Sequence, residues 1–249
     1  MGSRIVASAV VLAAALTSCR ESGSCPTCPP VAEAKPAQPG VPSVGSASTA
    51  AATATAFTRT YDDAIWGKNE SGTGHSGTGS TLHATVVYRA FLQQFLKDHN
   101  IKTVVDAGCG DWEFSQTIDW SGIDYRGYDI VESVIAKDKT KFGAPNINFF
   151  VGNIVEDELP AADLLISKHV MQHLPNADVI KFLGKRGKYK HVLLVNGVDP
   201  VTLLGTNTDI AVGDYRTLDV TQPPFDLRAA KLLSWWDGHH MNQVTHLTP

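Results

Sequence analysis

The sequence has no excess of positive charge and few cysteines. Its 21 Lys and Arg residues face 25 Asp and Glu residues, which gives a net charge of -4. Because phosphate binding needs clustered cations, this balance excludes a protein held to nucleic acid by a broad basic surface. Four cysteines in 249 residues are too few for a disulfide-stapled mini-domain or for several zinc sites. We therefore expect no nucleic-acid partner.

The sequence also lacks an apolar run long enough to cross a bilayer, which takes about 20 residues. The uncharged run Ile5–Leu16, which follows Arg4, is shorter and is typical of an export signal over residues 1–18. The end of this segment, Leu-Thr-Ser-Cys19, resembles the lipobox of bacterial lipoproteins. This resemblance implies a lipid-modified Cys19 and attachment to the cell envelope through that residue alone. An ordinary cleaved signal, or a misassigned start codon before a cytoplasmic enzyme, are the alternatives.

The segment 19–56 has almost no large or charged side chains. Ala, Pro, Ser, Thr, Gly and Val dominate it, so it offers little to bury, and we expect a flexible tether. Cys25 and Cys28 within it have the spacing of a redox motif. A thioredoxin-like motif opens a helix after a strand, whereas this pair lies among prolines. A local disulfide or no role is the prediction.

Residues 57–249 hold all five tryptophans and all six tyrosines, and we expect them to form the globular domain. Apolar residues at a period of 3.6 predict a helix over 84–100. β-branched runs then alternate with helical stretches, which is typical of a parallel sheet covered on both faces. We predict an α/β fold with a doubly wound, mostly parallel sheet and an antiparallel C-terminal strand. The expected parallel strands are KTVVDAG, RGYDIV, INFFVGN, ADLLISK and HVLLVNG.

A glycine turn follows the first predicted strand, at the edge of a doubly wound sheet where ligands bind. Gly108 and Gly110 in this turn let the backbone approach a ligand closely. Asp129 ends the second strand 23 positions after Asp106, a separation suited to binding the two hydroxyls of a ribose. The pattern therefore indicates a cofactor that contains a nucleoside.

Two classes of cofactor fit a glycine turn with a later acid, and the residues after the turn distinguish them. Nicotinamide dinucleotides require a third glycine beside the pyrophosphate, and Glu113 takes its place. Asp111 and Glu113 would repel a pyrophosphate. They would attract the cationic sulfonium and ammonium groups of S-adenosylmethionine, which the sequence favours.

The segment VVDAGCGD resembles the first motif of class I S-adenosylmethionine-dependent methyltransferases. YRGYDIV and VGNIVEDELPAADLLISKHVMQHLP resemble the later motifs, and the whole resembles a bacterial subgroup of the class. The resemblance implies a Rossmann-like fold with Asp106, Gly108 and Gly110 at the methionine part of the cofactor, and Asp129 at its ribose. It also implies Asn153 as an acceptor for the adenine amino group, and further cofactor contacts from Cys109, Ile154 and Lys168.

The methyl acceptor is expected at the exit of the fourth strand. The resemblance places this exit beside the methyl-transfer centre, so we expect His169 to be a general base or orienting donor. His169 and His173 are four positions apart, but the acid of a metal motif is missing, and no metal is expected. Asp214 and Arg216, beyond the fifth strand, are predicted to bind the acceptor. A loop with Trp66 and residues 76–80 is predicted to close over the cleft.

The sequence thus predicts a methyltransferase that uses S-adenosylmethionine and acts on the O, N or S atom of a small molecule. The alternative is a lipid-anchored binding protein on the same fold without catalysis, because a cytosolic cofactor is scarce outside the inner membrane. A nucleotide-dependent oxidoreductase is a third hypothesis. It is disfavoured because Glu113 occupies the position of the third glycine that dinucleotide binding requires.

The lipobox predicts the N-terminus of the native protein. Mass spectrometry of protein from its host should find Cys19 as the first residue, carrying a diacylglyceryl group. An intact Met1 in the soluble fraction would refute this prediction.

Overall fold

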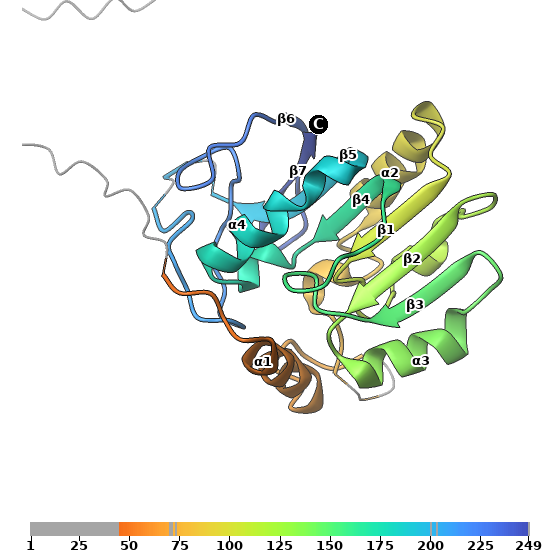
Figure 1. Cartoon of the computed structure of the whole chain (residues 1–249), viewed down its shortest axis with the longest axis horizontal. Coiled ribbons are helices and arrows are strands. Elements are labelled where there is room, and N and C mark those ends of the chain that lie inside the picture. Colours follow the sequence, from red (N-terminus) through yellow and green to blue (C-terminus); the bar gives the residue numbers. More distant parts are fainter. Residues whose placement is uncertain (1–44, 70–71, 73, 200, 203, 249) are drawn as a thin grey trace, which may run out of the picture. The chain divides into compact units, whose positions relative to one another are not determined.

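The computed structural model describes residues 45–69, 72, 74–199, 201–202 and 204–248 (Figure 1). The chain divides into two units, and the first, Met1–Pro39, lies outside the described residues. The predicted signal, Cys19 and most of the predicted tether therefore lie outside them as well. The helices are α1 (Ala50–Asp62), α2 (Val86–Asp98), α3 (Glu132–Phe142) and α4 (Asn176–Gly184). The strands are β1 (Thr103–Ala107), β2 (Asp124–Asp129), β3 (Ile147–Val151), β4 (Ala162–Lys168), β5 (Tyr189–Val198), β6 (Ala230–Trp236) and β7 (Met241–Leu247).

The strands form one seven-stranded sheet in the order β3-β2-β1-β4-β5-β7-β6. The first five strands are parallel, and β7 pairs antiparallel with both β5 and β6. Parallel neighbours need crossover connections, which α3 and α4 supply, whereas the short β6–β7 connection allows an antiparallel pair. The predicted doubly wound sheet with an antiparallel C-terminal strand is confirmed.

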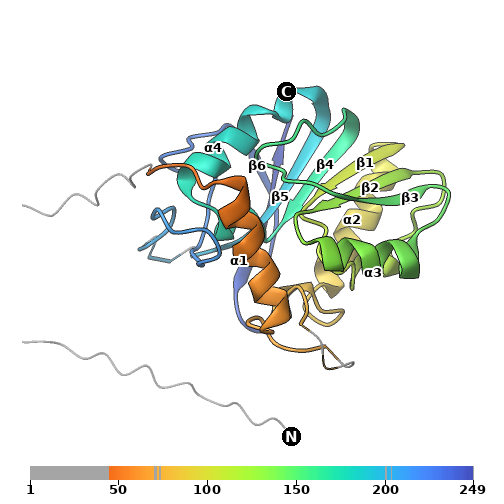
Figure 2. The same ribbon diagram turned by 60° about the horizontal axis from the view of Figure 1, so that its bottom comes forward.

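Helices cover both faces of the sheet (Figures 1 and 2). Successive residues of β1 point to opposite faces, so Val105 packs with α1 and α4 while Val104 packs with α2. On β4, Leu165 packs on the face covered by α1 and α4, and Leu164 packs on the face covered by α2. Burial on both faces explains why these strands read as continuous apolar runs.

The structure corrects the predicted start of the globular part at residue 57. Helix α1 begins at Ala50, inside the predicted tether, and the Thr49 hydroxyl caps it by accepting from the amide of Ala52. Alanine is the best helix former, and the i, i+4 pair Phe57 and Tyr61 gives this helix an apolar face to bury. Composition alone predicts a tether, because small alanine side chains do not reveal that this helix packs against the rest of the domain.

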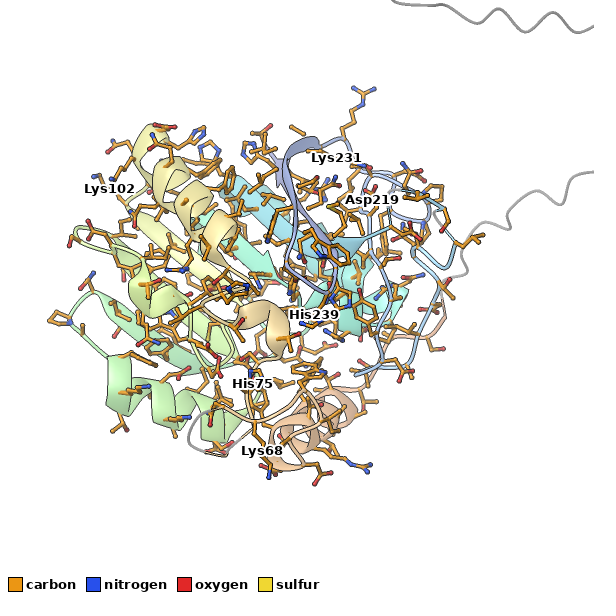
Figure 3. The ribbon with its side chains drawn as sticks, turned by 180° about the vertical axis from the view of Figure 1, so that it is seen from behind. Lys68, His75, Lys102, Asp219, Lys231 and His239 are labelled. Atoms are coloured by element: carbon orange, nitrogen blue, oxygen red, sulfur yellow. The ribbon has the colours of Figure 1, made fainter. Side chains whose placement is uncertain are left out.

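An irregular segment of about thirty residues, 199–229, joins β5 to β6. Buried Asn207 organises it by donating to the carbonyls of Asp219 and Pro223, both at 2.8 Å. Lys231 of β6 pairs with Asp219 at 2.7 Å, which ties this segment to the C-terminal hairpin (Figure 3). Among the described residues, no helix is long and apolar enough to cross a membrane.

One acidic side chain of α3, Asp138, is buried among the described residues without a hydrogen-bond donor, and Lys137 and Lys141 only partly offset the effect of its burial. The carboxyl of Asp138 is fully buried, and neither of its oxygens has a hydrogen-bond partner among the described residues. Burial raises its pKa to about 8, and the nearby Asp111 and Asp129 act in the same direction. The group is therefore mostly protonated at neutral pH.

Asp138→Asn should make the stability of the fold less dependent on pH. In the unfolded chain this carboxyl ionises near pH 4, but in the folded chain it keeps its proton up to about pH 8. Its contribution therefore favours folding below pH 4 and is lost as the pH rises towards 8, by up to about 1.4 kcal/mol per unit. Denaturant unfolding at pH 5 and pH 8 should show that the variant gains stability over the parent as the pH rises. The exposed Asp62→Asn is the matched control, and a gain that does not change with pH would contradict the prediction.

Candidate active site

A cavity opens at the carboxyl ends of β1 to β4, where parallel sheets bind ligands. It collects the residues after each of these strands, so side chains distant in sequence meet there. All eight residues predicted to bind the cofactor line this cavity, and so does His169. The eight are Asp106, Gly108, Cys109, Gly110, Asp129, Asn153, Ile154 and Lys168.

The glycine turn after β1 is shaped by close packing. Gly108 and Gly110 have φ values of +86° and +58°, which side chains rarely adopt. A Cβ at Gly108 would lie 2.2 Å from Val170, and one at Gly110 would lie 2.3 Å from the Ser76 hydroxyl. The turn can therefore approach both the β4 exit and the loop around Ser76 only because it is made of glycine.

Asp129 at the end of β2 faces back towards the same turn. Its carboxylate accepts from the amides of Gly110 at 3.1 Å and Val131 at 3.0 Å. Burial raises its pKa, and these two bonds oppose the rise. The glycine turn and the second strand are thus joined by an acid that borders the cavity.

Asp106 and Lys168 are opposite charges on neighbouring strands, and both are buried. Burial raises the pKa of Asp106 to about 6, although a 2.7 Å bond from the Tyr125 hydroxyl favours its ionised form. Burial lowers the pKa of Lys168 to about 7, and its amine donates to the Gly79 carbonyl at 2.7 Å. Both groups therefore titrate closer to neutral pH than their free side chains do.

Asn153 lies in the cavity wall, but its amide oxygen is already used. Oδ1 accepts from the backbone amides of Val155 at 2.9 Å and Glu156 at 3.3 Å, which closes the turn after β3. The prediction that this oxygen accepts from an adenine amino group therefore does not fit the structure. Asn is common in such turns because its side chain bonds to the backbone that follows it.

Helix α1 and the loop that follows it cover the cavity. Thr53, Phe57 and Tyr61 of α1 line it, and the Tyr61 hydroxyl lies 2.7 Å from the Ser76 hydroxyl. Trp66 and Ser76 line it too, as the predicted covering loop requires. The cavity lining predicted from the sequence does not include α1. The i, i+4 spacing of Phe57 and Tyr61 is the signal for a helix with an apolar face at this position.

A second cavity adjoins the first, and the two share Trp66, Ser76 and His169. Its lining comes from the loop after α1, the β4 exit, the end of β5, the segment between β5 and β6, and the C-terminal hairpin. His169 therefore stands at the boundary between the two spaces. The remaining lining residues are Ile65, Gly77, Thr78, Gly79, Gln172, His173, Gly197, Tyr215, His240 and Asn242.

Hydrogen bonds assign the tautomer of His169. The Asn242 amide nitrogen donates to the Asp237 carboxylate at 2.8 Å and to the His240 carbonyl at 3.2 Å. The Asn242 oxygen must therefore be the atom that faces His169 Nε2 at 2.7 Å, so Nε2 carries the proton. Nδ1 is left as an acceptor, 3.3 Å from the Lys168 amine. Burial and the neighbouring Lys168 lower the pKa of His169, so the ring is neutral.

His173 has a different environment from His169. Its Nδ1 donates to the Asp214 carbonyl at 2.9 Å, and its ring lies 4.9 Å from that of Trp66. Burial lowers its pKa to about 4. The two histidines therefore bond to separate partners on different elements.

The structure brings neither Asp214 nor Arg216 into the lining of either cavity, so their binding of the acceptor stays a prediction without support from the cavity geometry. Arg216 is buried and donates to the Met171 carbonyl and to Asn176 Oδ1, both at 2.9 Å. The side chain of Asp214 is exposed. Tyr215, between them, does line the second cavity.

The sheet order and the cavity agree with the predicted class of protein, the S-adenosylmethionine-dependent methyltransferases. Residues 49–198, more than half of the chain, match the family described as the O-methyltransferase domain. The chain therefore belongs to that family, it is an enzyme of this class, and S-adenosylmethionine is its cofactor. No curated protein matches the sequence.

Solved structures share the fold at low sequence identity. Human N-acetylserotonin methyltransferase in complex with S-adenosylmethionine has a TM-score of 0.51 and 15% identity, over 67% of this chain and 53% of that chain. The N-methyltransferase NodS from Bradyrhizobium japonicum WM9, in complex with S-adenosylhomocysteine, has a TM-score of 0.52 and 9% identity, over 68% and 89%. The methyltransferase domain of bacterial CtHen1 has a TM-score of 0.50 and 15% identity, over 67% and 100%. These similarities show the fold.

Proposed function

We propose that the enzyme methylates a hydroxyl group of a small, uncharged molecule, with the cofactor in the first cavity and the acceptor in the second. The observation that carries this proposal is the position of His169, which borders both cavities with an unprotonated Nδ1. A base at that boundary is placed to remove a proton from an acceptor oxygen next to the transferred methyl group.

The first cavity suits S-adenosylmethionine in shape and charge. The two glycines let the turn pack closely against Val170 and Ser76 at the cavity wall, and Asp106, Asp111 and Asp129 place acids near this turn. Such acids favour the cationic sulfonium and ammonium groups. Asp129 would hold the ribose and the turn at Gly108 the methionine part, while Ile154 and Cys109 would contact the cofactor as apolar walls.

The second cavity suits an acceptor without charge. Among its described lining residues, none is Asp, Glu, Lys or Arg. Burial lowers the pKa values of His169 and His173 and raises that of Tyr215, so these side chains are neutral as well. A charged acceptor would lose its hydration there without a countercharge, which is costly.

The proton path follows from the tautomer of His169. When bound, S-adenosylmethionine supplies an electrophilic methyl group on a positively charged sulfur. Nδ1 of His169 would accept the hydroxyl proton as the methyl group passes from sulfur to the acceptor oxygen, with the carbon–sulfur bond breaking to leave neutral S-adenosylhomocysteine. In the imidazolium that results, Nε2–H still donates to the Asn242 oxygen. The Asp237 carboxylate, which accepts from the amide nitrogen of Asn242, stabilises the positive charge. The Lys168 amine, held on the Gly79 carbonyl, lies 3.3 Å from Nδ1, and an acceptor hydroxyl would replace it as the partner of the single Nδ1 lone pair.

We further propose that this enzyme is attached to the cell envelope through Cys19. The lipobox-like Leu-Thr-Ser-Cys19 and the polar, proline-rich stretch behind it support this location. A tether of that composition would leave the catalytic domain free to meet soluble acceptors.

Asp129→Ala should weaken binding of S-adenosylmethionine by about 1.5–3 kcal/mol, the range for losing hydrogen bonds to a charged group. Calorimetry on the purified protein measures this loss, and binding of NAD should be weaker than that of S-adenosylmethionine throughout. Asp124→Ala, at the other end of β2, is the matched control and should leave the affinity unchanged. An unaltered dissociation constant in Asp129→Ala would place the ribose elsewhere.

His169→Gln should lower kcat by a factor of about 10²–10⁴, because general-base catalysis is lost. Its dissociation constant for S-adenosylmethionine should stay within about threefold, since the ring lies at the edge of the cofactor cavity. Transfer of a labelled methyl group to a panel of small phenols and alcohols measures turnover. His239→Gln, on the exposed turn between β6 and β7, should match the parent. Equal turnover in His169→Gln and the parent would rule out the proposed base.

A further inference from the structure

Three histidines meet at the end of the sheet opposite the cleft. His99 caps the C-terminus of α2, His191 lies near the start of β5, and His246 lies near the end of β7. The ring centroid of His191 is 4.5 Å from that of His99 and 5.3 Å from that of His246. Figure 3 marks this end of the molecule by Lys102, which precedes β1, and the cleft end by His75.

Two of these rings point nitrogen to nitrogen. His191 Nδ1 and His246 Nε2 are 3.1 Å apart, on neighbouring antiparallel strands. Two imidazoles bound to one tetrahedral ion, with metal–nitrogen bonds of about 2.0–2.1 Å, have nitrogens about 3.3 Å apart. The nitrogen separation therefore needs to change by only a few tenths of an ångström, but an ion would lie to one side of the line that joins the nitrogens, so both rings would also turn until their lone pairs converge on it.

A single phenyl ring contacts all three histidines, and it restricts the two half-buried ones, His191 and His246. The centroid of buried Phe95 lies 4.1 Å from that of His99, 5.6 Å from that of His191 and 5.3 Å from that of His246. Packing against one ring limits the rotamers of its neighbours. Less conformational entropy is then lost when the imidazoles gather around an ion.

We propose that His191 and His246 bind a divalent late first-row transition ion of the Cu²⁺ or Zn²⁺ type. Imidazole nitrogens suit these ions, and Cu²⁺ binds most tightly in that series. His99 is exposed and would supply a third nitrogen by rotating its side chain, with water completing the coordination. The ion would clamp β7 to β5 on the strand that also carries Asn242, and the assignment does not depend on the proposed acceptor or base.

Cu²⁺ itself is the probe, because its electron paramagnetic resonance spectrum reports bound nitrogens. The full chain is used with Cys19→Ser, Cys25→Ser and Cys28→Ser, which remove competing thiols. One Cu²⁺ should bind with nitrogen hyperfine structure from at least two imidazoles. His191→Gln and His246→Gln should each weaken binding by about tenfold or more, and His99→Gln by less.

Two control variants show where the ion is held. His239→Gln removes an exposed histidine away from the cluster and should change nothing. His75→Gln tests the other group of ligand-type side chains in the described residues, His75, Asp111 and Glu113, whose ligand atoms lie within 4.8 Å of one another. It should leave Cu²⁺ binding intact.

Stability and cofactor binding separate a lost site from a lost fold. Excess Zn²⁺ should raise the Tm of the parent but not that of the His191→Gln/His246→Gln double variant, because binding to the folded state stabilises it. The double variant should still bind S-adenosylmethionine. The proposal is overturned if this folded variant keeps the Cu²⁺ affinity and spectrum of the parent, if His75→Gln abolishes binding instead, or if the parent binds no Cu²⁺.

Discussion

The pairing of β7 with β5 inserts the C-terminal strand into the sheet, between β5 and the edge strand β6. Seven residue pairs from Val192 and Leu247 to Val198 and Met241 form this antiparallel ladder. The pairing satisfies the backbone N–H and C=O groups along one side of β5, which would otherwise form an exposed sheet edge. It also sets Asn242 opposite Gly197, within reach of His169. Without this ladder the second cavity would lose a wall and His169 would lose the group that fixes its tautomer.

The same strand connects the two ends of the domain. Asn242 and His246 lie four residues apart, on one face of β7, so one bonds to the base candidate while the other joins the histidine cluster. Trp235 on the neighbouring β6 stacks on Tyr88 of α2 with an interplanar angle of 11°. The C-terminal hairpin therefore contacts α2 as well as β5. Its position affects both the cavity beside His169 and the histidine cluster.

Burial, more than ion pairing, controls protonation around the cleft. It brings the pKa of Asp106 up to about 6 and that of Lys168 down to about 7, and it keeps His169 neutral. A neutral histidine has a lone pair to offer, whereas an exposed one would be partly protonated. The acids at the glycine turn remain close enough to a cationic cofactor to favour it.

The sequence by itself determined the α/β class, the parallel strands and the cofactor, because a glycine turn and an acid at the next strand end are local features whose spacing survives folding. It also marked His169 and the loop around Ser76, both of which line the cavities. Only the tertiary structure decided that Ala50–Asp62 is a docked helix and that Arg216 points inward to Met171. It alone revealed the partnership of Asn242 with His169. These outcomes depend on which face of a segment meets which neighbour, and contacts across 73 positions, as between His169 and Asn242, leave no periodic trace in the sequence.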